Sequence, residues 1–301
     1  MKILITGATG MIGGELVSKF HELGVAINYL TTAKDKIEKR EEYQGFYWNP
    51  SQQEIDLDCF NEVSVIINLV GANVASRWTS TYKQEIIDSR VQSAQTLMKG
   101  LQAIDHQIEY LISASAIGVY PDSLTKLYEE DETKLNDEFI GAVVQQWEKS
   151  VNKFKDLGIK VAKLRIGLVL SDQGGALEKM KQPIAYYAGA PLGSGNQWQS
   201  WIHVDDLCEM FIHCIKEQEE GVFNAVAPNP VNNKELTLAI AKTLNKPIIL
   251  PNVPAFVLKL MLGEMAIIVL SSQYVSCKKI ESTGFQFTYT YLNNALDNLL
   301  R

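Results

Sequence analysis

A glycine-rich segment directly after the first apolar stretch places the strongest constraint on the fold of this chain. The chain opens Lys2-Ile3-Leu4-Ile5-Thr6 and continues Gly7-Ala8-Thr9-Gly10-Met11-Ile12-Gly13, after which apolar residues recur at helical spacing as far as Leu23. A strand, a tight glycine turn and a helix in this order direct the unpaired N–H groups of the helix N-terminus at a phosphate. The sequence therefore predicts an N-terminal unit that binds a dinucleotide.

Each glycine of this turn has an expected task. Gly7 allows the turn, Gly10 allows a pyrophosphate to approach, and Gly13 allows the helix to pack closely on the strand. The spacing is GxxGxxG rather than the GxGxxG of the commonest dehydrogenases, and a glycine triplet alone is weak evidence. Its place between a strand and a helix at the start of an α/β chain is what favours dinucleotide binding over a turn that merely retains glycines.

The end of the second expected strand, Ala26–Leu30, bears on the choice of dinucleotide. An acidic residue there would bind the adenosine ribose of NAD, whereas a basic residue would accept the 2′-phosphate of NADP. Here Thr31, Thr32 and Lys34 follow the strand, and no acid precedes Asp35. We therefore expect NADP(H), with NAD(H) as the alternative if Lys34 and Lys36 are only solvated charges.

Strand-like apolar runs alternate with helical patterns along the first two thirds of the chain, which predicts an α/β fold with a doubly wound parallel Rossmann sheet. Expected elements include the strands Val63–Leu69, Tyr110–Ser113 and Val161–Leu170 and the helices Tyr82–Leu101 and Gly141–Phe154. We expect residues 1–170 plus 202–226 to form the NAD(P)-binding domain. A smaller substrate-binding lobe is expected from residues 171–201 plus 227–301.

Composition excludes several classes of function. The 28 basic and 35 acidic residues give a net charge of −7, which does not favour a nucleic acid. Four widely spaced cysteines without a CxxC motif argue against a metal site or disulfides and suit a reducing compartment, so a cytoplasmic monomer or homodimer is expected. The apolar run Val253–Leu270 contains Lys259 and Glu264, so we expect a buried or half-buried helix, with a membrane or a partner surface as the alternatives.

Several motifs together resemble the extended short-chain dehydrogenase/reductase superfamily. They are the GxxGxxG turn, Asn68-Leu69-Val70-Gly71-Ala72 and Ser113-Ala114-Ser115-Ala116-Ile117-Gly118-Val119-Tyr120. Further blocks, among them Arg77-Trp78-Thr79, Ser89-Arg90-Val91, Arg165-Ile166-Gly167 and Ser200-Trp201-Ile202-His203, are similar to its atypical epimerase-like and cell-division-inhibitor-like branch. The resemblance covers essentially the whole chain. It implies the fold and the cofactor, with cofactor contacts expected at Gly7, Thr9, Gly10, Met11, Ile12, Gly13, Thr31, Thr32, Lys34, Leu69, Val70, Gly71, Ala72, Ser113, Arg165 and Gly167.

The same resemblance implies a catalytic set that is incomplete in this chain. Members of the superfamily use a tyrosine, a lysine four residues later, and a serine or threonine that polarises the substrate carbonyl. Ser115 is the expected serine and Ser113 the fallback, unless the hydroxyl only bonds backbone. The resemblance places the Tyr-Lys pair at Ile140 and Val144, neither of which can transfer a proton.

Other side chains could replace the missing pair, and each has a structural alternative. Tyr120 could face the nicotinamide or pack in the core, and Lys83 could act or be a solvated charge. Arg77 could clamp a substrate anion or stack on Trp78. His203 could contact substrate or hold a helix start beside Asp205 and Asp206. Trp198 and Trp201 could cover the substrate or belong to the core.

Three functions follow in order of preference. The first is an NADP(H)-dependent oxidoreductase or epimerase of an unidentified small molecule. The second is a non-catalytic NADP(H)-binding regulatory protein, which the absent Tyr-Lys pair favours. A sugar-nucleotide epimerase in the strict sense is third because that chemistry depends on the missing tyrosine.

Overall fold

The chain builds its fold around a large parallel sheet. The computed structural model describes residues 1–301. The parallel strands, in spatial order, are β13 (Gly221–Ala225), β9 (Lys160–Ile166), β7 (Tyr110–Ala116), β6 (Val65–Asn68), β1 (Lys2–Thr6), β2 (Ala26–Thr31) and β4 (Tyr43–Asn49). Two short strands, β3 (Lys39–Arg40) and β5 (Glu54–Ile55), pair antiparallel with β4. The strand order reverses between β1 and β6, which confirms the doubly wound sheet.

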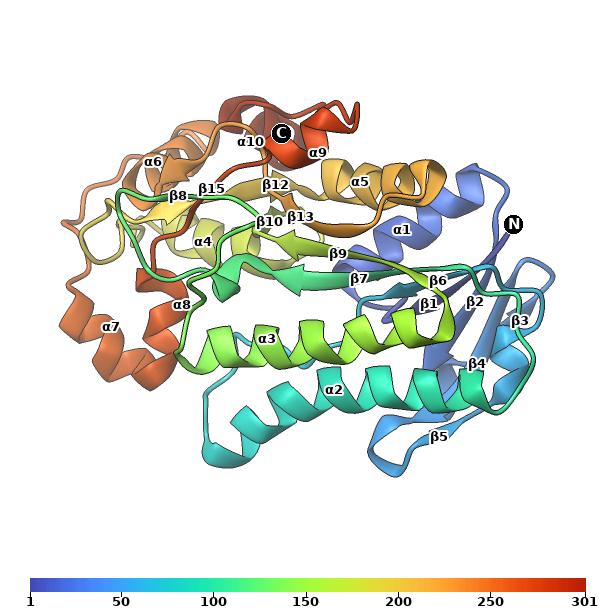
Figure 1. Cartoon of the computed structure of the whole chain (residues 1–301). Coiled ribbons are helices and arrows are strands. Elements are labelled where there is room, and N and C mark those ends of the chain that lie inside the picture. Colours follow the sequence, from blue (N-terminus) through green and yellow to red (C-terminus); the bar gives the residue numbers. More distant parts are fainter.

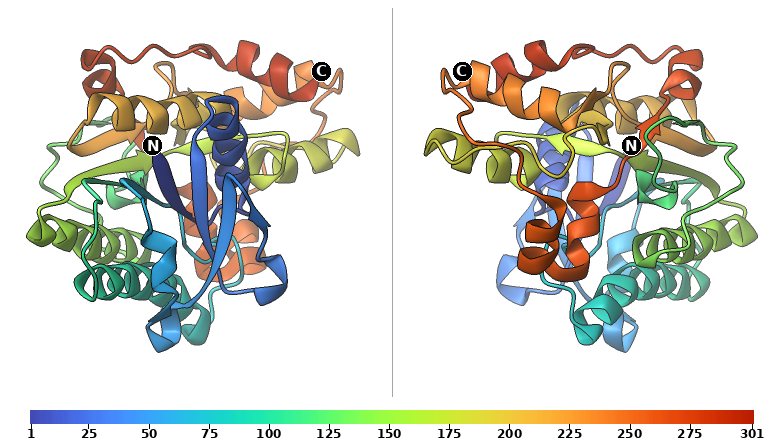
Figure 2. Two further views of the ribbon diagram at one scale, coloured as in Figure 1. Left: turned by 90° about the vertical axis from the view of Figure 1, so that its right-hand side faces the viewer. Right: turned by 90° about the vertical axis from the view of Figure 1, so that its left-hand side faces the viewer.

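Helices cover both faces of this sheet. Figures 1 and 2 show α2 (Ser80–Gln102) and α3 (Phe139–Asn152) on one face, and α1 (Met11–Glu22) and α5 (Val204–Glu217) on the other. Burial on both faces explains why the central strands are continuously apolar; Ile3, Leu4 and Ile5 are all fully buried. The helix α2 begins at Thr79, whose hydroxyl accepts the N–H of Tyr82.

The run expected as one strand, Val161–Leu170, is two strands. β9 ends at Ile166, and β10 (Leu168–Leu170) leaves the large sheet to pair with β12 (Trp201–His203). Gly167 stands at the break because a Cβ there would lie 2.1 Å from the carbonyl oxygen of Ser200. The glycine therefore lets the chain pass from the large sheet to the smaller part of the molecule.

A second apolar core lies beside the sheet. It is built by β10, β12, α4 (Gly175–Ala185), α6 (Asn233–Thr243) and α10 (Leu292–Leu300), with Trp201, Leu236 and Leu296 fully buried. The rest of the C-terminal segment does not join this core. Val275 of β15 (Tyr274–Val275), Ile280 of α9 (Lys278–Ser282) and Phe285 pack in the sheet core instead. The expected lobe of residues 171–201 plus 227–301 is therefore divided between two cores.

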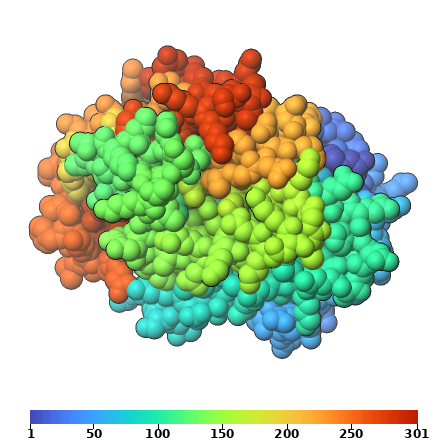
Figure 3. Space-filling model, in the orientation of Figure 1, coloured from blue at the N-terminus to red at the C-terminus, as the bar shows by residue number.

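Two further short strand pairs hold the C-terminal segments against the middle of the chain. β15 pairs with β8 (Leu127–Tyr128), and β11 (Trp198–Gln199) pairs with β14 (Val231–Asn232). The space-filling view shows the red and orange C-terminal segments lying against the green middle of the chain (Figure 3).

The apolar run Val253–Leu270 differs from the expected helix. It forms α7 (Ala255–Leu262), a 3₁₀ turn (Gly263–Ala266) and α8 (Ile267–Leu270), because Gly263 adopts a positive φ of 61° and ends α7. Phe256, Leu260 and Met261 are 71, 85 and 74% exposed, so the expectation of a buried or half-buried helix is wrong for most of α7. No helix in the chain has both the length and the apolar character that spanning a membrane would need.

Candidate functional site

Three hollows lie along the edge of the sheet at which the parallel strands end. In Figure 1 the arrowheads of β7 and β9 point toward this edge, beside which α7 and α8 lie. We call the hollows the glycine-turn cleft, the inner cavity and the outer cleft. Ligands of open α/β sheets bind at the carboxyl ends of the strands, next to the reversal of strand order.

The glycine-turn cleft has a volume of about 900 Å³ and runs along the ends of β1, β2, β4 and β6. Gly7 adopts a φ of +76°, and its carbonyl accepts the N–H of Gly10 at 3.0 Å. The first hydrogen bond of α1 is that from Gly14 to Gly10, at 2.8 Å. The N–H groups of Met11, Ile12 and Gly13 precede it, so they form the anion-binding start of a helix.

Most of the residues expected to contact a cofactor line this cleft. They are Gly7, Thr9, Gly10, Thr31, Thr32, Leu69, Val70, Gly71 and Ala72. Sequence reasoning missed a second group, formed by the end of β4, the two residues after it and one side of α2: Trp48, Asn49, Pro50, Ser51, Thr81, Gln84, Glu85, Asp88, Ser89, Gln92 and Ser93. Lys34 lies outside the lining, with its Nζ 4.6 Å from the ring centre of Tyr47, and its contact with a phosphate stays a prediction.

Two residues expected to contact the cofactor are buried in hydrogen-bond networks instead. Ser113 is fully buried, and its hydroxyl accepts a hydrogen bond from the amide of Asn68 at 3.1 Å. Asn68 in turn accepts from the hydroxyl of Thr6 at 2.9 Å, so the network joins the ends of β1, β6 and β7. Arg165 is 6% exposed and bonds a carboxylate below the site. Both side chains therefore have structural partners in the protein, and their contact with a cofactor stays a prediction.

Glu148 of α3 is the centre of a buried charge cluster. Its carboxylate accepts hydrogen bonds from Arg165 at 2.9 and 3.1 Å and from the hydroxyl of Ser115 at 2.7 Å, and Lys163 lies 3.4 Å away. Burial alone would raise the pKa of Glu148, but the hydrogen bonds and charge of Arg165 outweigh it, so the pKa lies below its ordinary value. This carboxylate is therefore ionised and forms ion pairs with Arg165 and Lys163.

The cluster and its neighbours engage the hydroxyls of both residues expected to be catalytic, Ser115 and Tyr120, whose catalytic roles stay predictions. Ser115 is 3% exposed, donates to Glu148 and lines none of the three hollows. Tyr120 is fully buried, donates to Asn224 at 2.7 Å and accepts from Arg165 at 2.9 Å. Burial raises the pKa of Tyr120 to about 12, despite Arg165, which makes proton release unfavourable. Successive side chains of a strand point to opposite faces, and the residue after Ser115, Ala116, lines the inner cavity.

The inner cavity occupies the place where the missing pair is expected. It has a volume of about 210 Å³, and both Ile140 and Val144 line it. The remaining lining is also largely apolar: Val74, Arg90, Ala116, Ile117, Gly118, Asn136, Val143, Trp147, Ile166, Gly167, Leu168, Trp198, Gln199, Ser200, Ile267, Ile268, Ser271 and Gln273. Among all these side chains only Arg90 carries a charge.

Arg90 is held in place by backbone oxygens. Its guanidinium donates to the carbonyls of Ile86 at 2.9 Å and of Ala72 at 3.2 and 3.3 Å, and stacks 5.0 Å from the ring centre of Trp147. No carboxylate lies within ion-pair distance, and burial lowers the pKa of Arg90 to about 10. Sequence reasoning quoted Arg90 only within a motif. The sequence signal that could have identified Arg90 is its spacing. It lies four residues after Ile86 and four before Ala94, so all three share the buried face of α2.

Four other residues were expected near the substrate, and one of the four lines a hollow. Trp198 lines the inner cavity. Arg77 is exposed and lines none of the hollows, and Trp78 instead meets the ring of Phe139. Trp201 is fully buried in the second core, with its Nε1 bonded to the carbonyl of Asn229 at 2.9 Å. Neither Arg77 nor Trp201 lines any of the three hollows, and their contact with a substrate stays a prediction.

His203 caps the start of α5, which is the structural alternative expected for it from the sequence. It is 1% exposed, and its Nδ1 accepts the N–H of Asp205 at 3.0 Å to cap α5. Its Nε2 lies 3.1 Å from Oδ1 of Asn298. Burial lowers the pKa of His203, even though Asp205 acts in the opposite direction. The ring is therefore a neutral cap, and its contact with a substrate stays a prediction.

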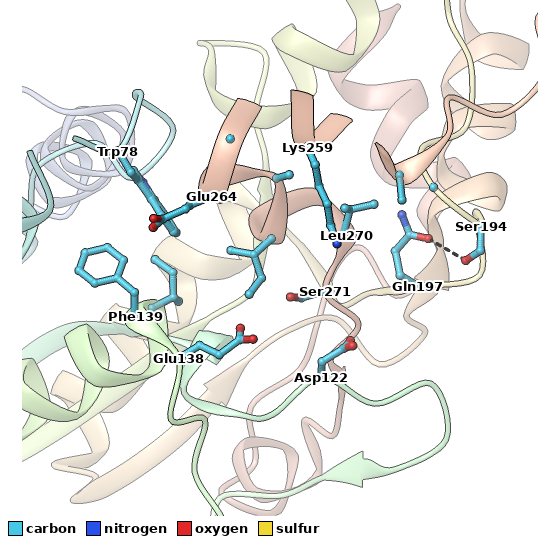
Figure 4. A pocket seen from close by; sticks show the side chains of 16 residues that line it. Trp78, Asp122, Glu138, Phe139, Ser194, Gln197, Lys259, Glu264, Leu270 and Ser271 are labelled. Carbon is cyan, nitrogen blue, oxygen red and sulfur yellow. Dashed lines mark hydrogen bonds between the residues drawn. The ribbon is translucent and has the colours of Figure 1, made fainter. Parts of the chain in front are cut away.

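The outer cleft adjoins the inner cavity and shares Ile140, Ile267 and Ser271 with it. It has a volume of about 880 Å³. Figure 4 shows Asp122, Glu138 and Glu264 around the same opening as Lys259. Lys83, the other expected acid/base candidate, forms an ion pair with Glu264 at this opening. All four cysteines are free and buried, and no group of three or more metal-binding side chains is present.

Sequence comparison relates the chain to known proteins over nearly its full length. The NAD dependent epimerase/dehydratase family matches residues 3–226, and a domain of unknown function, DUF1731, matches residues 253–299. An epimerase family protein of Staphylococcus epidermidis is 38% identical over 301 residues, covering 100% of this chain and 99% of the relative. An epimerase family protein of Staphylococcus aureus is 38% identical over 298 residues, covering 99% and 98%.

Solved structures share the fold. The human epimerase family protein SDR39U1, solved with NADPH, is 25% identical with a TM-score of 0.84 and 99% coverage of both chains. A nucleoside-diphosphate sugar epimerase of Corynebacterium glutamicum is 28% identical with a TM-score of 0.78, covering 100% of this chain and 58% of that one. A UDP-glucuronic acid 4-epimerase of Bacillus cereus, at 16% identity and a TM-score of 0.80, is alike in fold.

Proposed function

The chain belongs to the NAD-dependent epimerase/dehydratase family, and on that premise we propose that it is an NADP(H)-dependent oxidoreductase of a small molecule. Hydride would pass between the nicotinamide and a substrate held in the inner cavity. The proposal differs from the usual reaction of such folds because no tyrosine or lysine lines that cavity.

One observation carries this proposal, namely that the glycine-turn cleft and the inner cavity meet at the same segment. Gly71 and Ala72 line the cleft, Val74 lines the cavity, and α2 contributes Ser89 to the first and Arg90 to the second. A dinucleotide with its pyrophosphate at the start of α1 would extend along this segment. Its nicotinamide end would then reach the cavity, where a substrate is shielded from water.

Three features support NADP(H) over NAD(H). Thr31 and Thr32 line the cleft where β2 ends, and neither is acidic. Lys34 lies in the turn that follows β2, and it is the first cationic residue after Thr32 in the sequence. The human relative named above was solved with NADPH. A carboxylate at the end of β2 is the feature that favours NAD, and this chain lacks it.

The chemistry proposed is hydride transfer with a proton exchanged with water. Reduction of a carbonyl adds hydride to carbon and a proton to oxygen, and the apolar lining at Ile140 and Val144 supplies no proton. The outer cleft opens onto the cavity at Ser271, and water entering there would provide it. Without a general acid, we expect turnover to be slower than in enzymes that have one, by about 10²–10⁴-fold.

The outer cleft argues against a sugar nucleotide as substrate. A sugar nucleotide would have to place its diphosphate outside the inner cavity, whose volume is only about 210 Å³. Asp122, Glu138 and Glu264 line the outer cleft together with Lys259, and Lys83 pairs with Glu264, so Asp122 and Glu138 are the carboxylates there without an ion-pair partner. A diphosphate there would meet like charges, which disfavours binding.

The test combines cofactor binding with hydride transfer. NADPH and NADH are titrated by calorimetry, and 4-deuterated NADPH of each stereochemistry is then offered with a panel of small carbonyl compounds. We expect NADPH to bind more tightly than NADH. We also expect deuterium transfer to the substrate from only one of the two stereoisomers of deuterated NADPH. A Gly7→Val variant, strained at φ +76° and with its Cβ 3.3 Å from Leu69, serves as the binding-deficient control. NADPH binding without any deuterium transfer across the panel would refute the oxidoreductase.

A regulatory protein is the second candidate, and α7 favours it. Phe256, Leu260 and Met261 expose apolar surface close to Lys259, which lines the outer cleft. Exposed apolar patches of this kind are typical of surfaces that bind a partner. In that case NADP(H) occupancy would alter the affinity for the partner, and no hydride would move. Stereospecific deuterium transfer would exclude this candidate.

A further inference from the structure

The inner cavity contains a cation that has no anion. Arg90 makes three hydrogen bonds, all to backbone carbonyls, whereas a guanidinium has five N–H groups. Two N–H groups therefore remain without a protein acceptor. The other two interior cations nearby, Arg165 and Lys163, share Glu148, so the chain does neutralise buried charge elsewhere. Arg90 is partly buried in this cavity, and a charge that has lost part of its hydration is stabilised when a ligand supplies an anion.

A second unpaired donor lies on the ring against which Arg90 stacks. Trp147 is 5% exposed and lines the inner cavity, and its Nε1 is the only buried side-chain nitrogen or oxygen in the chain without a hydrogen-bond partner. Buried indole N–H groups normally have an acceptor, because leaving one unpaired costs about 1–3 kcal/mol. Two neighbouring residues that line this largely apolar cavity thus have N–H groups without a protein acceptor.

We propose that Arg90 and Trp147 bind a carboxylate of the substrate, so that the proposed reaction acts on a small, largely apolar acid. The hydride transfer in this inference rests on the proposed function, whereas the carboxylate site is argued from Arg90 and Trp147 alone. The planar guanidinium matches the two oxygens of a carboxylate, and the indole N–H supplies a further donor to the same group.

The remaining lining defines the body of such an acid. Ile117, Ile140, Val143, Val144 and Ile267 present aliphatic surface and no charge. An aliphatic or aromatic body would gain from burial against this surface. The same lining also holds neutral polar residues, which could each pair with a single polar group of the ligand: Asn136, Gln199, Ser200, Ser271 and Gln273. The acid must also be small, because the cavity holds about 210 Å³.

The cofactor is the competing source of an anion, because Arg90 lies beside the glycine-turn cleft. A Cβ on Gly71, which lines that cleft, would lie 2.7 Å from the guanidinium carbon of Arg90. Arg90 itself lines the inner cavity and not the cleft. The experiment must therefore separate binding of a carboxylate from binding of the pyrophosphate.

The probes are small carboxylates from acetate to 3-phenylpropanoate, each paired with its neutral amide. Binding to the full-length protein is measured by calorimetry, with and without saturating NADP⁺. We expect at least one carboxylate to bind roughly tenfold or more tightly than its amide. Arg90→Met should reduce the affinity for that carboxylate to the affinity for the amide. Trp147→Phe, which keeps the ring and removes only the N–H, should reduce it by roughly threefold to tenfold.

Controls make each outcome decisive. Arg40→Met removes an exposed arginine and should change neither affinity, and Arg90→Lys keeps the charge in case Arg90→Met does not fold. Equal binding of every carboxylate and its amide would overturn the inference. So would an Arg90→Met variant that loses affinity for NADP⁺ while its carboxylate affinity is unchanged. If the unmodified protein does not bind NADP⁺, the proposed function is refuted. The carboxylate site is tested independently, by the titrations without cofactor.

Discussion

Glu148 holds together the charges below the inner cavity, although it touches none of the three hollows. It is the only acidic partner of Arg165 and of Lys163, both of which are about 6% exposed. Such a pair is weak evidence for net stability, but removing one partner leaves an uncompensated buried charge. The expected consequence is a large loss of stability rather than a specific loss of chemistry.

We predict that Glu148→Gln lowers the free energy of unfolding by about 3–5 kcal/mol. Urea denaturation followed by circular dichroism measures this change. The matched control is Glu209→Gln, which breaks an exposed pair with Lys19 and should cost less than about 1 kcal/mol. Equal effects of the two substitutions would show that the buried cluster does not need its carboxylate.

His203 gives the molecule a stability that depends on pH. Burial lowers the pKa of His203 in the folded state, whereas an unfolded histidine titrates near its ordinary value of about 6.5. The unfolded chain therefore binds more protons as the pH falls below about 6.5, so stability decreases in that direction. Burial raises the pKa of the neighbouring Asp206, which acts in the opposite sense at lower pH.

We predict that His203→Asn flattens this dependence between pH 7.5 and pH 5.5. Asparagine retains an oxygen that can accept the N–H of Asp205 at the start of α5 but does not titrate. Free energies of unfolding at three pH values in this range provide the measurement. Identical slopes for the two proteins would mean that another group causes the acid sensitivity.

At the scale of elements, the packing of α1 on the glycine turn depends on one of two adjacent glycines. A Cβ on Gly13 would lie 2.1 Å from the carbonyl oxygen of Gly7 and 2.8 Å from the Cα of Ala8, whereas a Cβ on Gly14 would meet nothing within 4 Å. The backbone must therefore move in one case and not in the other. The two positions form a natural pair of test and control.

We predict that Gly13→Ala weakens NADPH binding at least about tenfold and destabilises the fold by about 1–3 kcal/mol. Gly14→Ala should retain NADPH affinity and stabilise the protein by about 0.5–1 kcal/mol, since alanine is the better helix residue. Calorimetry and thermal denaturation give both quantities. An unchanged affinity in Gly13→Ala would place the pyrophosphate elsewhere.

Sequence patterns predicted the elements whose residues follow one clear rule. The turn at Gly7–Gly13 and the alternation of strands and helices follow from spacing and apolar runs. The strand β4 was missed because its aromatic residues, Tyr47 and Trp48 among them, are only partly apolar and the run resembles a loop. The break at Gly167 was missed because its cause is the carbonyl of Ser200, which is distant in sequence.

Prediction of the site was uneven for a similar reason. Backbone-lined positions such as Gly10 and Gly71 follow from local motifs, and they line the expected cleft. Ser115 and Tyr120 line none of the hollows. Their hydroxyls bond Glu148 and Asn224, and local motifs could not reveal these partners because they come from other elements. The unpaired state of Arg90 could be seen only after every possible acidic partner had been placed in space.

At the scale of the whole molecule, a dinucleotide would bind across segments from β1, β2, β4, β6 and α2. A ligand that binds only the folded state stabilises the entire chain by mass action. We predict that NADPH at about 100 times its dissociation constant raises the melting temperature by roughly 5 °C. NADH at the same concentration should raise it less. A larger shift with NADH in differential scanning calorimetry would reverse the proposed cofactor preference.

The acidic outer cleft also controls how fast a charged substrate can arrive. A small acid bound for Arg90 must first pass Asp122, Glu138 and Glu264, on a molecule whose net charge is −7. Repulsion of this kind acts over the Debye length, which shrinks from about 30 Å at 0.01 M salt to about 10 Å at 0.1 M. Added salt should therefore speed the association of the acid. Most electrostatically guided encounters show the opposite dependence on ionic strength, because salt weakens the attraction that guides them.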